Sequence, residues 1–213
     1  MRFKVPKTLD PSTREEILNV AQKVFAEIGF KEATVRQICK AAKANVCLIS
    51  YYFGGKDGLY KSVFERTTQV RVEQLRSLLG NPAAIATHEE YRLRFQLLLE
   101  GINKQISLNP DFFKLMQREM IDGMPRAESV IKPFIALTHQ MLSNFIDAGQ
   151  KAKYVKRDLD TQVATLCIIN MFVGALAQQH TDVSFFFKGI NPKDIPEIVI
   201  KTVSQIFFEG VLQ

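Results

Sequence analysis

The sequence of 213 residues contains no tryptophan and only three cysteines. Cys39, Cys47 and Cys167 form no C-x-x-C pair, so the sequence predicts neither a disulfide framework nor a zinc ribbon. A reducing compartment is the simpler interpretation. We expect Cys39 and Cys47 to be small buried apolar side chains rather than a redox or metal-binding pair.

Long hydrophobic runs are also missing. Residues 161–181 carry no charged side chain, but their apolar centre, Val163 to Ala177, is shorter than the roughly 20 residues that a membrane span needs. We expect this helix to be buried in a core or at a subunit interface, with no membrane partner. The first residues, MRFKVPKTLDPSTREE, lack the apolar segment of a signal peptide. These absences together predict a cytoplasmic protein.

The common signatures of catalytic sites are absent as well. The sequence has no P-loop, no G-x-G-x-x-G and no G-x-S-x-G, and its three histidines do not stand at a metal-ligand spacing. We therefore expect no enzyme activity, no cofactor and no bound metal.

Charge is distributed unevenly along the chain. Residues 1–80 contain 14 Lys and Arg against 8 Asp and Glu, whereas residues 81–213 contain 14 of each. The whole net charge of +6 therefore belongs to the first part of the chain. A basic surface there favours an anionic partner such as nucleic acid.

Apolar residues recur at helical spacing along nearly the whole chain, and no convincing strand pattern is present. The sequence therefore predicts an all-α fold of about nine helices. The expected helices cover residues 12–28, 34–42, 45–53, 56–79, 88–107, 110–120, 125–149, 159–180 and 193–210.

The first three helices are short, and a tight connection precedes the third, which is the pattern of a helix-turn-helix unit. Ser12–Glu15 and Thr34–Gln37 are spaced as capping boxes, and Asn45 is a favourable N-cap for the third helix. Gly54-Gly55 ends that helix. We expect a helix-turn-helix domain over 1–55, a connecting helix over about 56–79, and a second domain over 80–213.

The stretch from Arg14 to Phe64 resembles the N-terminal domain of TetR-family transcriptional regulators. The resemblance rests on A-x-x-x-F-x-x-x-G-F at the end of the first helix, on Thr34 before V-x-x-I, and on Y-F-x-x-K-x-x-L at 52–59. The segment NVCLISYYFGGKDGLY, residues 45–60, is similar to the corresponding segment of a CecR-like subgroup. The resemblance implies an all-α homodimer with a DNA-binding head and a larger domain for ligand binding and dimerisation.

The resemblance also implies roles for individual residues on double-stranded DNA. Thr34 would bind a backbone phosphate, Arg36 would read a guanine, and Tyr51, Tyr52 and Lys56 would clamp phosphates. The groove-facing part of the third helix would present Asn45, Val46, Leu48 and Ser50. The usual Gly-Val before this helix is Lys43-Ala44 here. Val46, Cys47 and Leu48 stand where small or polar residues are common in the family, so base reading is expected to depend on Arg36 and on apolar contacts with thymine methyl groups.

The second part of the chain is rich in flexible and aromatic side chains, since the whole sequence has 16 Phe and 6 Met. The resemblance places a pocket among residues 88–150, and each side chain there could equally be plain core. The candidate ligand residues are Phe95, Leu98, Asn103, Phe112, Phe113, Met116, Gln117, Met120, Phe134, His139 and Met141.

These observations predict a ligand-responsive transcriptional regulator, most often a repressor in such a family, which binds a pseudo-palindromic operator as a homodimer. Its effector is expected to be a small apolar or aromatic molecule. The uncharged helix at 161–179 and the last helix resemble a dimerising pair, although packing within one chain explains them too. The alternative is a soluble helical module that binds a small molecule or lipid without any operator. The third and least favoured hypothesis is an enzyme.

Overall fold

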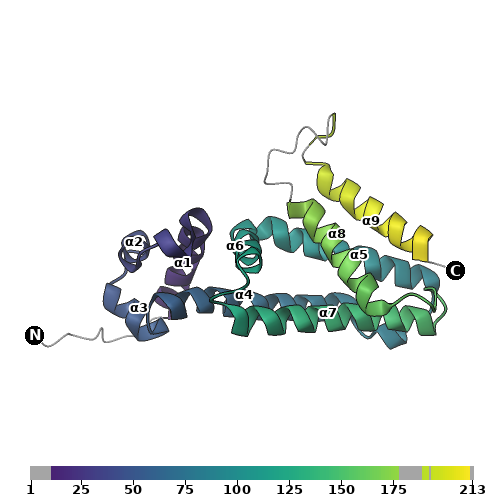
Figure 1. Ribbon diagram of the computed structural model, residues 1–213, viewed down its shortest axis with the longest axis horizontal. Coiled ribbons are helices and arrows are strands. Elements are labelled where there is room, and N and C mark those ends of the chain that lie inside the picture. Colours follow the sequence, from purple (N-terminus) through teal and green to yellow (C-terminus); the bar gives the residue numbers. More distant parts are fainter. Residues whose placement is uncertain (1–10, 178–188, 192, 212–213) are drawn as a thin grey trace, which may run out of the picture. The chain divides into compact units, whose positions relative to one another are not determined.

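The computed structural model describes residues 11–177, 189–191 and 193–211. Within these residues the chain forms nine α-helices and one short 3-10 helix, with no strand (Figure 1), which confirms the all-α expectation. The helices are α1 (Pro11–Glu32), α2 (Val35–Ala41), α3 (Val46–Phe53), α4 (Lys56–Leu79), η1 (Pro82–Ala84), α5 (His88–Leu108), α6 (Pro110–Ile121), α7 (Glu128–Lys151), α8 (Thr161–Ala177) and α9 (Ile195–Val211).

The helices pack into two compact units whose boundaries differ from the expected domains. The head unit combines the chain up to Val70 with Asn109–Pro133, and the body unit combines Arg71–Leu108 with the chain from Phe134 onward. Helix α6 therefore packs with the N-terminal helices rather than with the rest of the 80–213 segment. Both α4 and α7 contribute one part to each unit, and the boundary in α7 falls at Pro133, inside the helix.

Aromatic side chains form the core of the head unit. The rings of Phe25 and Tyr60 lie 4.9 Å apart, those of Tyr60 and Phe64 5.2 Å, and those of Phe64 and Phe112 5.6 Å. This chain of contacts runs from α1 through α4 to α6. Helix α6 joins it because its apolar residues repeat on one side, as an amphipathic helix requires. The buried residues of α6 are Phe112, Phe113, Leu115, Met116 and Glu119.

Two polar contacts also attach α6 to α1. The side chain of Asn109 does not cap α6 as its position at the helix start predicts; its Oδ1 accepts a hydrogen bond of 2.6 Å from Gln22 Nε2. The guanidinium of Arg118 donates to the carbonyl of Phe25 over 3.3 Å. Both partners on α1 are far from α6 in sequence, so helical periodicity alone could not indicate them.

Three sequence-based helix ends need correction. Helix α1 begins at Pro11, so Ser12 cannot be its N-cap, and Glu15 instead pairs with Arg14 and Arg66. Helix α7 begins at Glu128 rather than at 125, because the preceding amides donate to the side chain of Glu119. The first helix is expected to end at residue 28, but the backbone only kinks at Gly29, with φ 82°, and α1 continues to Glu32. The expected end of the 159–180 helix at residue 180 lies outside the described residues.

The body unit has a second aromatic core. Tyr91 stacks on Phe145 with ring centroids 4.4 Å apart, and Phe95 stacks on Phe207 at 4.5 Å. These contacts join α5 to α7 and to α9. In the part of the chain that the structure describes, no helix has both the length and the hydropathy needed to cross a membrane.

Candidate nucleic-acid interface

The start of α2 is a complete capping box, as the sequence predicts. The backbone amide of Gln37 donates to Thr34 Oγ1 over 3.2 Å, and the amide of Thr34 donates to Gln37 Oε1 over 2.7 Å. The Thr34 hydroxyl donates to the same Gln37 oxygen over 2.8 Å. A phosphate that accepts a hydrogen bond from the Thr34 hydroxyl therefore has to replace Gln37 Oε1 as the acceptor.

Helix α3 is held between two well-defined ends. Asn45 is its N-cap, and Asn45 Oδ1 accepts a hydrogen bond from the amide of Cys47. At the other end Gly54 adopts a left-handed conformation, φ 73°, which favours glycine. Gly58, in the first turn of α4, lies against α3 so closely that an added Cβ would stand 1.7 Å from the carbonyl oxygen of Phe53. These constraints fix α3 relative to α4.

One side of α3 is open to solvent. Val46, Cys47, Ser50 and Tyr51 are all exposed, and their spacing puts them on neighbouring rows of the helix. Tyr51 is the most prominent of them, with 59% of its surface exposed. The expectation that Cys47 is buried is wrong, because Cys47 lies between Val46 and Tyr51 on this side. Cys39, on α2, is buried as expected, and burial raises the pKa of its thiol.

The opposite side of α3 faces the head core. Ile49 and Phe53 are buried there, and the Arg14 guanidinium lies 5.3 Å from the centre of the Phe53 ring. Leu48 and Tyr52 stand between the two sides and are half-buried. The rings of Tyr51 and Tyr52 pack edge to face with their centroids 5.4 Å apart, so each ring stabilises the position of the other. Tyr51 and Phe53 are two positions apart, which is about 200° around the helix, so they face opposite sides of α3.

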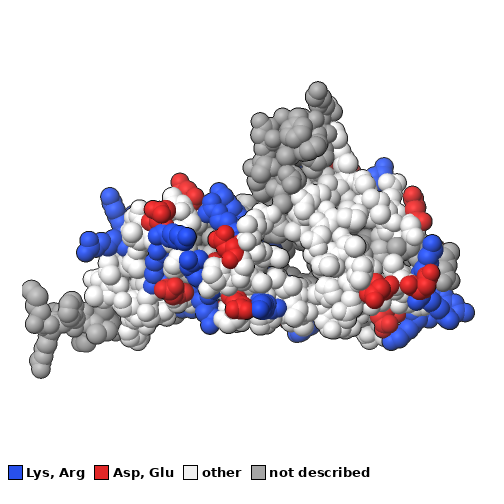
Figure 2. Space-filling model, viewed as in Figure 1, with Lys and Arg blue, Asp and Glu red and all other residues white. Residues whose placement is uncertain are grey.

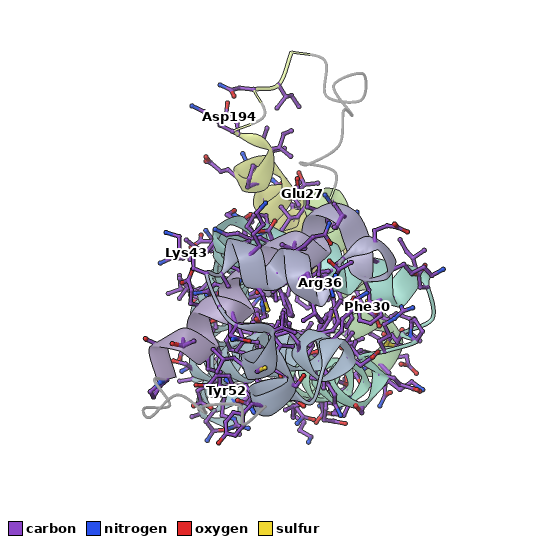
Figure 3. The ribbon with its side chains drawn as sticks, turned by 90° about the vertical axis from the view of Figure 1, so that its left-hand side faces the viewer. Glu27, Phe30, Arg36, Lys43, Tyr52 and Asp194 are labelled. Carbon is purple, nitrogen blue, oxygen red and sulfur yellow. The ribbon has the colours of Figure 1, made fainter. Side chains whose placement is uncertain are left out.

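The predicted cations of the interface differ in their surroundings. Arg36 is exposed near the start of α2, and none of the ion pairs among the described residues involves it. Lys56 is half-buried: its Nζ donates to the carbonyl of Lys31 and lies 4.3 Å from the centre of the Phe30 ring. Figure 3 looks onto the end of the head unit where Arg36, Lys43 and Tyr52 are labelled. Figure 2 shows basic side chains over α2.

The comparisons with known proteins agree with this geometry. A family model described as bacterial regulatory proteins of the tetR family matches residues 17–63, which cover most of α1, all of α2 and α3, and the start of α4. The HTH-type transcriptional repressor NicS of Pseudomonas putida is 27% identical over 93% of this chain and 92% of its own length. The protein is a TetR-family transcriptional regulator.

Solved structures of other regulators share the fold of this chain. The fatty acid degradation regulator FadR from Bacillus halodurans has a TM-score of 0.75 at 22% identity, covering 96% of this chain and 98% of its own. A putative transcriptional regulator from Saccharomonospora viridis, solved in complex with choline, has a TM-score of 0.76 at 16% identity, covering 96% and 100%. The comparisons do not confirm the CecR-like subgroup for this TetR-family regulator.

The candidate ligand residues of this TetR-family regulator divide between the two units. Those on α5 and α7 belong to the body unit. Phe95 and Leu98 are fully buried, Asn103 is half-buried, and its Oδ1 is a buried atom with no hydrogen-bond partner among the described residues. Phe134, His139 and Met141 on α7 are half-buried, and the His139 ring contacts the carbonyl of Gln162 at 3.2 Å.

The remaining candidates lie on α6 in the head unit. Phe112, Phe113 and Met116 are buried, Gln117 is half-buried, and Met120 is exposed. A cavity of about 320 Å³ opens in this unit, but it is lined by other residues, among them Phe30, Tyr60, Arg118 and Arg126. A cavity of about 360 Å³ in the body unit is likewise lined by none of the candidates.

Proposed function

We propose that this TetR-family regulator is a ligand-responsive repressor. It binds a pseudo-palindromic operator as a homodimer and responds to a small apolar or aromatic molecule. The observation that carries the DNA-binding part is the open side of α3, which presents Val46, Cys47, Ser50 and Tyr51, together with the exposed Arg36 near the start of α2. This set combines thymine-methyl contact, guanine reading and phosphate binding.

The proposed DNA contacts divide into two kinds. Arg36, Val46, Leu48 and Ser50 read bases, and the half-buried position of Leu48 restricts it to the edge of the contact. Thr34, Asn45, Tyr51, Tyr52 and Lys56 bind phosphates or sugars and fix the register. In a helix-turn-helix domain the second helix of the motif, here α3, lies in the major groove.

The proposed homodimer uses the exposed apolar side chains of α8 and α9, two helices that pack together in the body unit. Val163 and Leu166 on α8 are 58% and 54% exposed, and Ile206 on α9 is 51% exposed. Surfaces of this kind in soluble proteins mark interaction sites. Helix α8 itself contains no charged residue, and most of the surface over it in Figure 2 is uncharged. A two-fold dimer lets two heads contact half-sites about 34–36 Å apart.

The proposed effector site lies in the body unit near Asn103. Asn103 Oδ1 on α5 and Ser204 Oγ on α9 are both buried without a hydrogen-bond partner among the described residues, and α5 packs on α9. An unsatisfied buried polar atom is costly, so a bound donor group would be stabilised there. The Saccharomonospora viridis regulator holds choline within the same fold, which supports a small-molecule site in principle.

Selection of duplexes from a random library, followed by gel shift, tests the function. The wild-type protein should enrich a palindromic sequence and bind it at least about a thousandfold more tightly than an unrelated duplex at moderate salt, within the range usual for specific binding. Because an operator is part of the chromosome, we expect the protein to act in the cytoplasm. Enrichment of no sequence, with small-molecule binding retained, would support instead a module that binds ligands without DNA.

The Asn103→Ala variant tests the effector site against Leu93→Ala, an exposed position on the same helix. A thermal-shift screen of small apolar and aromatic molecules should identify compounds that stabilise the wild-type protein and release the selected operator. Asn103→Ala should weaken the response to those compounds while operator binding without compound stays unchanged. An equal response in both variants would remove Asn103 from the proposed site.

A further inference from the structure

Lys43 occupies a backbone position that suits glycine. It follows α2 with φ 50°, in the left-handed region that side chains other than glycine, asparagine and aspartate rarely adopt. Its amide donates to the carbonyl of Lys40 over 3.4 Å, and the amide of Ala44 donates to the carbonyl of Cys39 over 2.9 Å. This hydrogen-bond pair is the helix-ending motif in which glycine is the usual residue. The turn thus carries a lysine at a conformational cost.

Lys43 adds a third cation close to two that lie on α2. Arg36 and Lys40 are four residues apart, which puts them on one side of the helix, and Lys43 is two residues past the helix end. All three are exposed, and no ion pair among the described residues involves any of them. Other cations of the head unit do have carboxylate partners: Arg66 pairs with Glu15, and Arg126 with Glu119.

The position of Lys43 relates these cations to the recognition helix. Only Ala44 separates it from Asn45, the N-cap of α3, and Val46 begins the solvent-exposed side of that helix. The Lys43 side chain is visible from the same side of the head unit as Arg36 and Tyr52 (Figure 3). When α3 lies in a major groove, a cation this close to its start faces the sugar-phosphate strand that borders the groove.

We propose that Lys43 binds a backbone phosphate at the edge of the major groove, next to the start of α3. The inference rests on the proposed DNA binding by the head and adds a contact to it. A lysine ammonium is a point charge on a flexible stem, so this contact contributes affinity and register but reads no base. Lys40, in the last turn of α2, is a second exposed cation close to Lys43 in the chain.

The chain offers a matched control for the backbone of Lys43. Lys153 follows α7 with φ 63°, and it has the same pair of hydrogen bonds: its amide donates to Gln150 and the next amide, of Tyr154, donates to Gly149. Lys153 belongs to the body unit. Replacing either lysine with glycine removes one charge and relieves the same left-handed conformation. Only the loss of the Lys43 charge is expected to change DNA binding.

The experiment compares Lys43→Gly, Lys43→Arg and Lys153→Gly with the wild-type protein. Each is titrated against the selected operator and against an unrelated 30-bp duplex over a range of salt concentrations. Lys43→Gly should bind both duplexes about eightfold more weakly per head at 0.1 M salt, with a salt slope reduced by about 0.9 per head. Lys43→Arg and Lys153→Gly should keep the wild-type slope. The melting temperatures of the two glycine variants should be unchanged or raised.

Three results would overturn the inference. If Lys43→Gly keeps the wild-type slope, Lys43 binds no phosphate. If its loss of affinity is confined to the selected operator, the side chain reads a base instead. If Lys153→Gly loses as much affinity as Lys43→Gly, the effect belongs to total charge and not to this position. Failure of the wild-type protein to bind either duplex at 50 mM salt is a different result, because it overturns the proposed function as well.

Discussion

The Tyr60 hydroxyl donates a hydrogen bond of 3.0 Å to Oε1 of Glu119, and both side chains are almost completely buried. The other carboxylate oxygen of Glu119 accepts from the backbone amides of Arg126 and Ala127 at 3.3 and 3.2 Å. A single carboxylate on α6 therefore holds α4 on one side and the start of α7 on the other. All of these groups belong to the head unit.

Replacing Tyr60 with phenylalanine should destabilise the protein by about 1–3 kcal/mol, because a buried carboxylate loses a donor that no water can replace. Urea unfolding followed by circular dichroism measures the free energy of unfolding. Tyr52→Phe is the control, since Tyr52 is half-buried and its hydroxyl has no hydrogen bond among those of the described residues. Equal stability of the two variants would show that the Tyr60–Glu119 bond contributes little.

Stability should fall in alkali because of Tyr91. Burial raises the pKa of Tyr91 above its ordinary value, and its hydroxyl donates to the carbonyl of Phe145. A raised folded-state pKa gives stability that is fully present below the unfolded pKa, near 10, and is lost as the pH rises above it. Urea midpoints between pH 9 and 11 should therefore fall less steeply for Tyr91→Phe than for the wild-type protein. Parallel slopes would contradict the assignment.

Gly58→Ala should disturb the junction of α3 and α4. The added Cβ would stand 1.7 Å from the Phe53 carbonyl oxygen, a backbone atom that cannot move without moving α3. We expect a loss of roughly 1–3 kcal/mol and weaker operator binding. Gly210→Ala, in α9, meets no atom within 4 Å and is the control, with stability unchanged or slightly raised. A stable Gly58→Ala variant with normal operator binding would be incompatible with this close approach.

Arg36→Ala should relax specificity at one base pair of the operator. A side chain that reads a base contributes about 1–3 kcal/mol of discrimination at that pair. Binding to a set of single-base operator variants measures this, with Lys40→Ala as the control on the same side of α2. Lys40→Ala should weaken binding to every sequence alike. If Arg36→Ala behaves as Lys40→Ala does, Arg36 contacts phosphate and the base-reading role is wrong.

Leu166→Arg should turn the proposed dimer into a monomer. An arginine at the exposed centre of the uncharged α8 would bring two like charges together across a two-fold axis. Sedimentation at micromolar concentration should give half the wild-type mass, and operator binding should be lost. Leu93→Arg on α5, similarly exposed, is the control. A dimeric Leu166→Arg variant would place the interface elsewhere.

The sequence predicted the local features of the head well because they depend on neighbours in the chain. The Thr34–Gln37 capping box, the Asn45 N-cap and the Gly54 helix end each involve residues within four positions of one another. The two-residue spacing of Tyr51 and Phe53 on α3 also accounts for the exposure of the first and the burial of the second. The same spacing, applied to Cys47, would have placed it on the exposed side, but its apolar character suggested burial.

The membership of α6 in the head unit could not be read from the sequence. It depends on Phe112 meeting Phe64, on Asn109 meeting Gln22 and on Arg118 meeting the carbonyl of Phe25, and these pairs are 48 to 93 positions apart. Periodicity shows which side of a helix is apolar but not which helix covers that side. Glu119 was missed for the same reason, because a buried carboxylate is recognised only by the donors around it.

Residues 109–133, which contain α6, belong to the head unit, whereas the segments before and after them in the sequence belong to the body unit. This arrangement matters for the construction of hybrid regulators from this chain. A fusion that takes residues 1–79 as an interchangeable DNA-binding cassette would leave Phe64 without Phe112 and Tyr60 without Glu119. A cassette of residues 1–55 would omit Tyr60 and Phe64 as well. Such a cassette also needs residues 109–133, which return to it from later in the chain. Operator preference is therefore more safely reprogrammed by exchanging the surface residues of α2 and α3 than by grafting the segment that contains them.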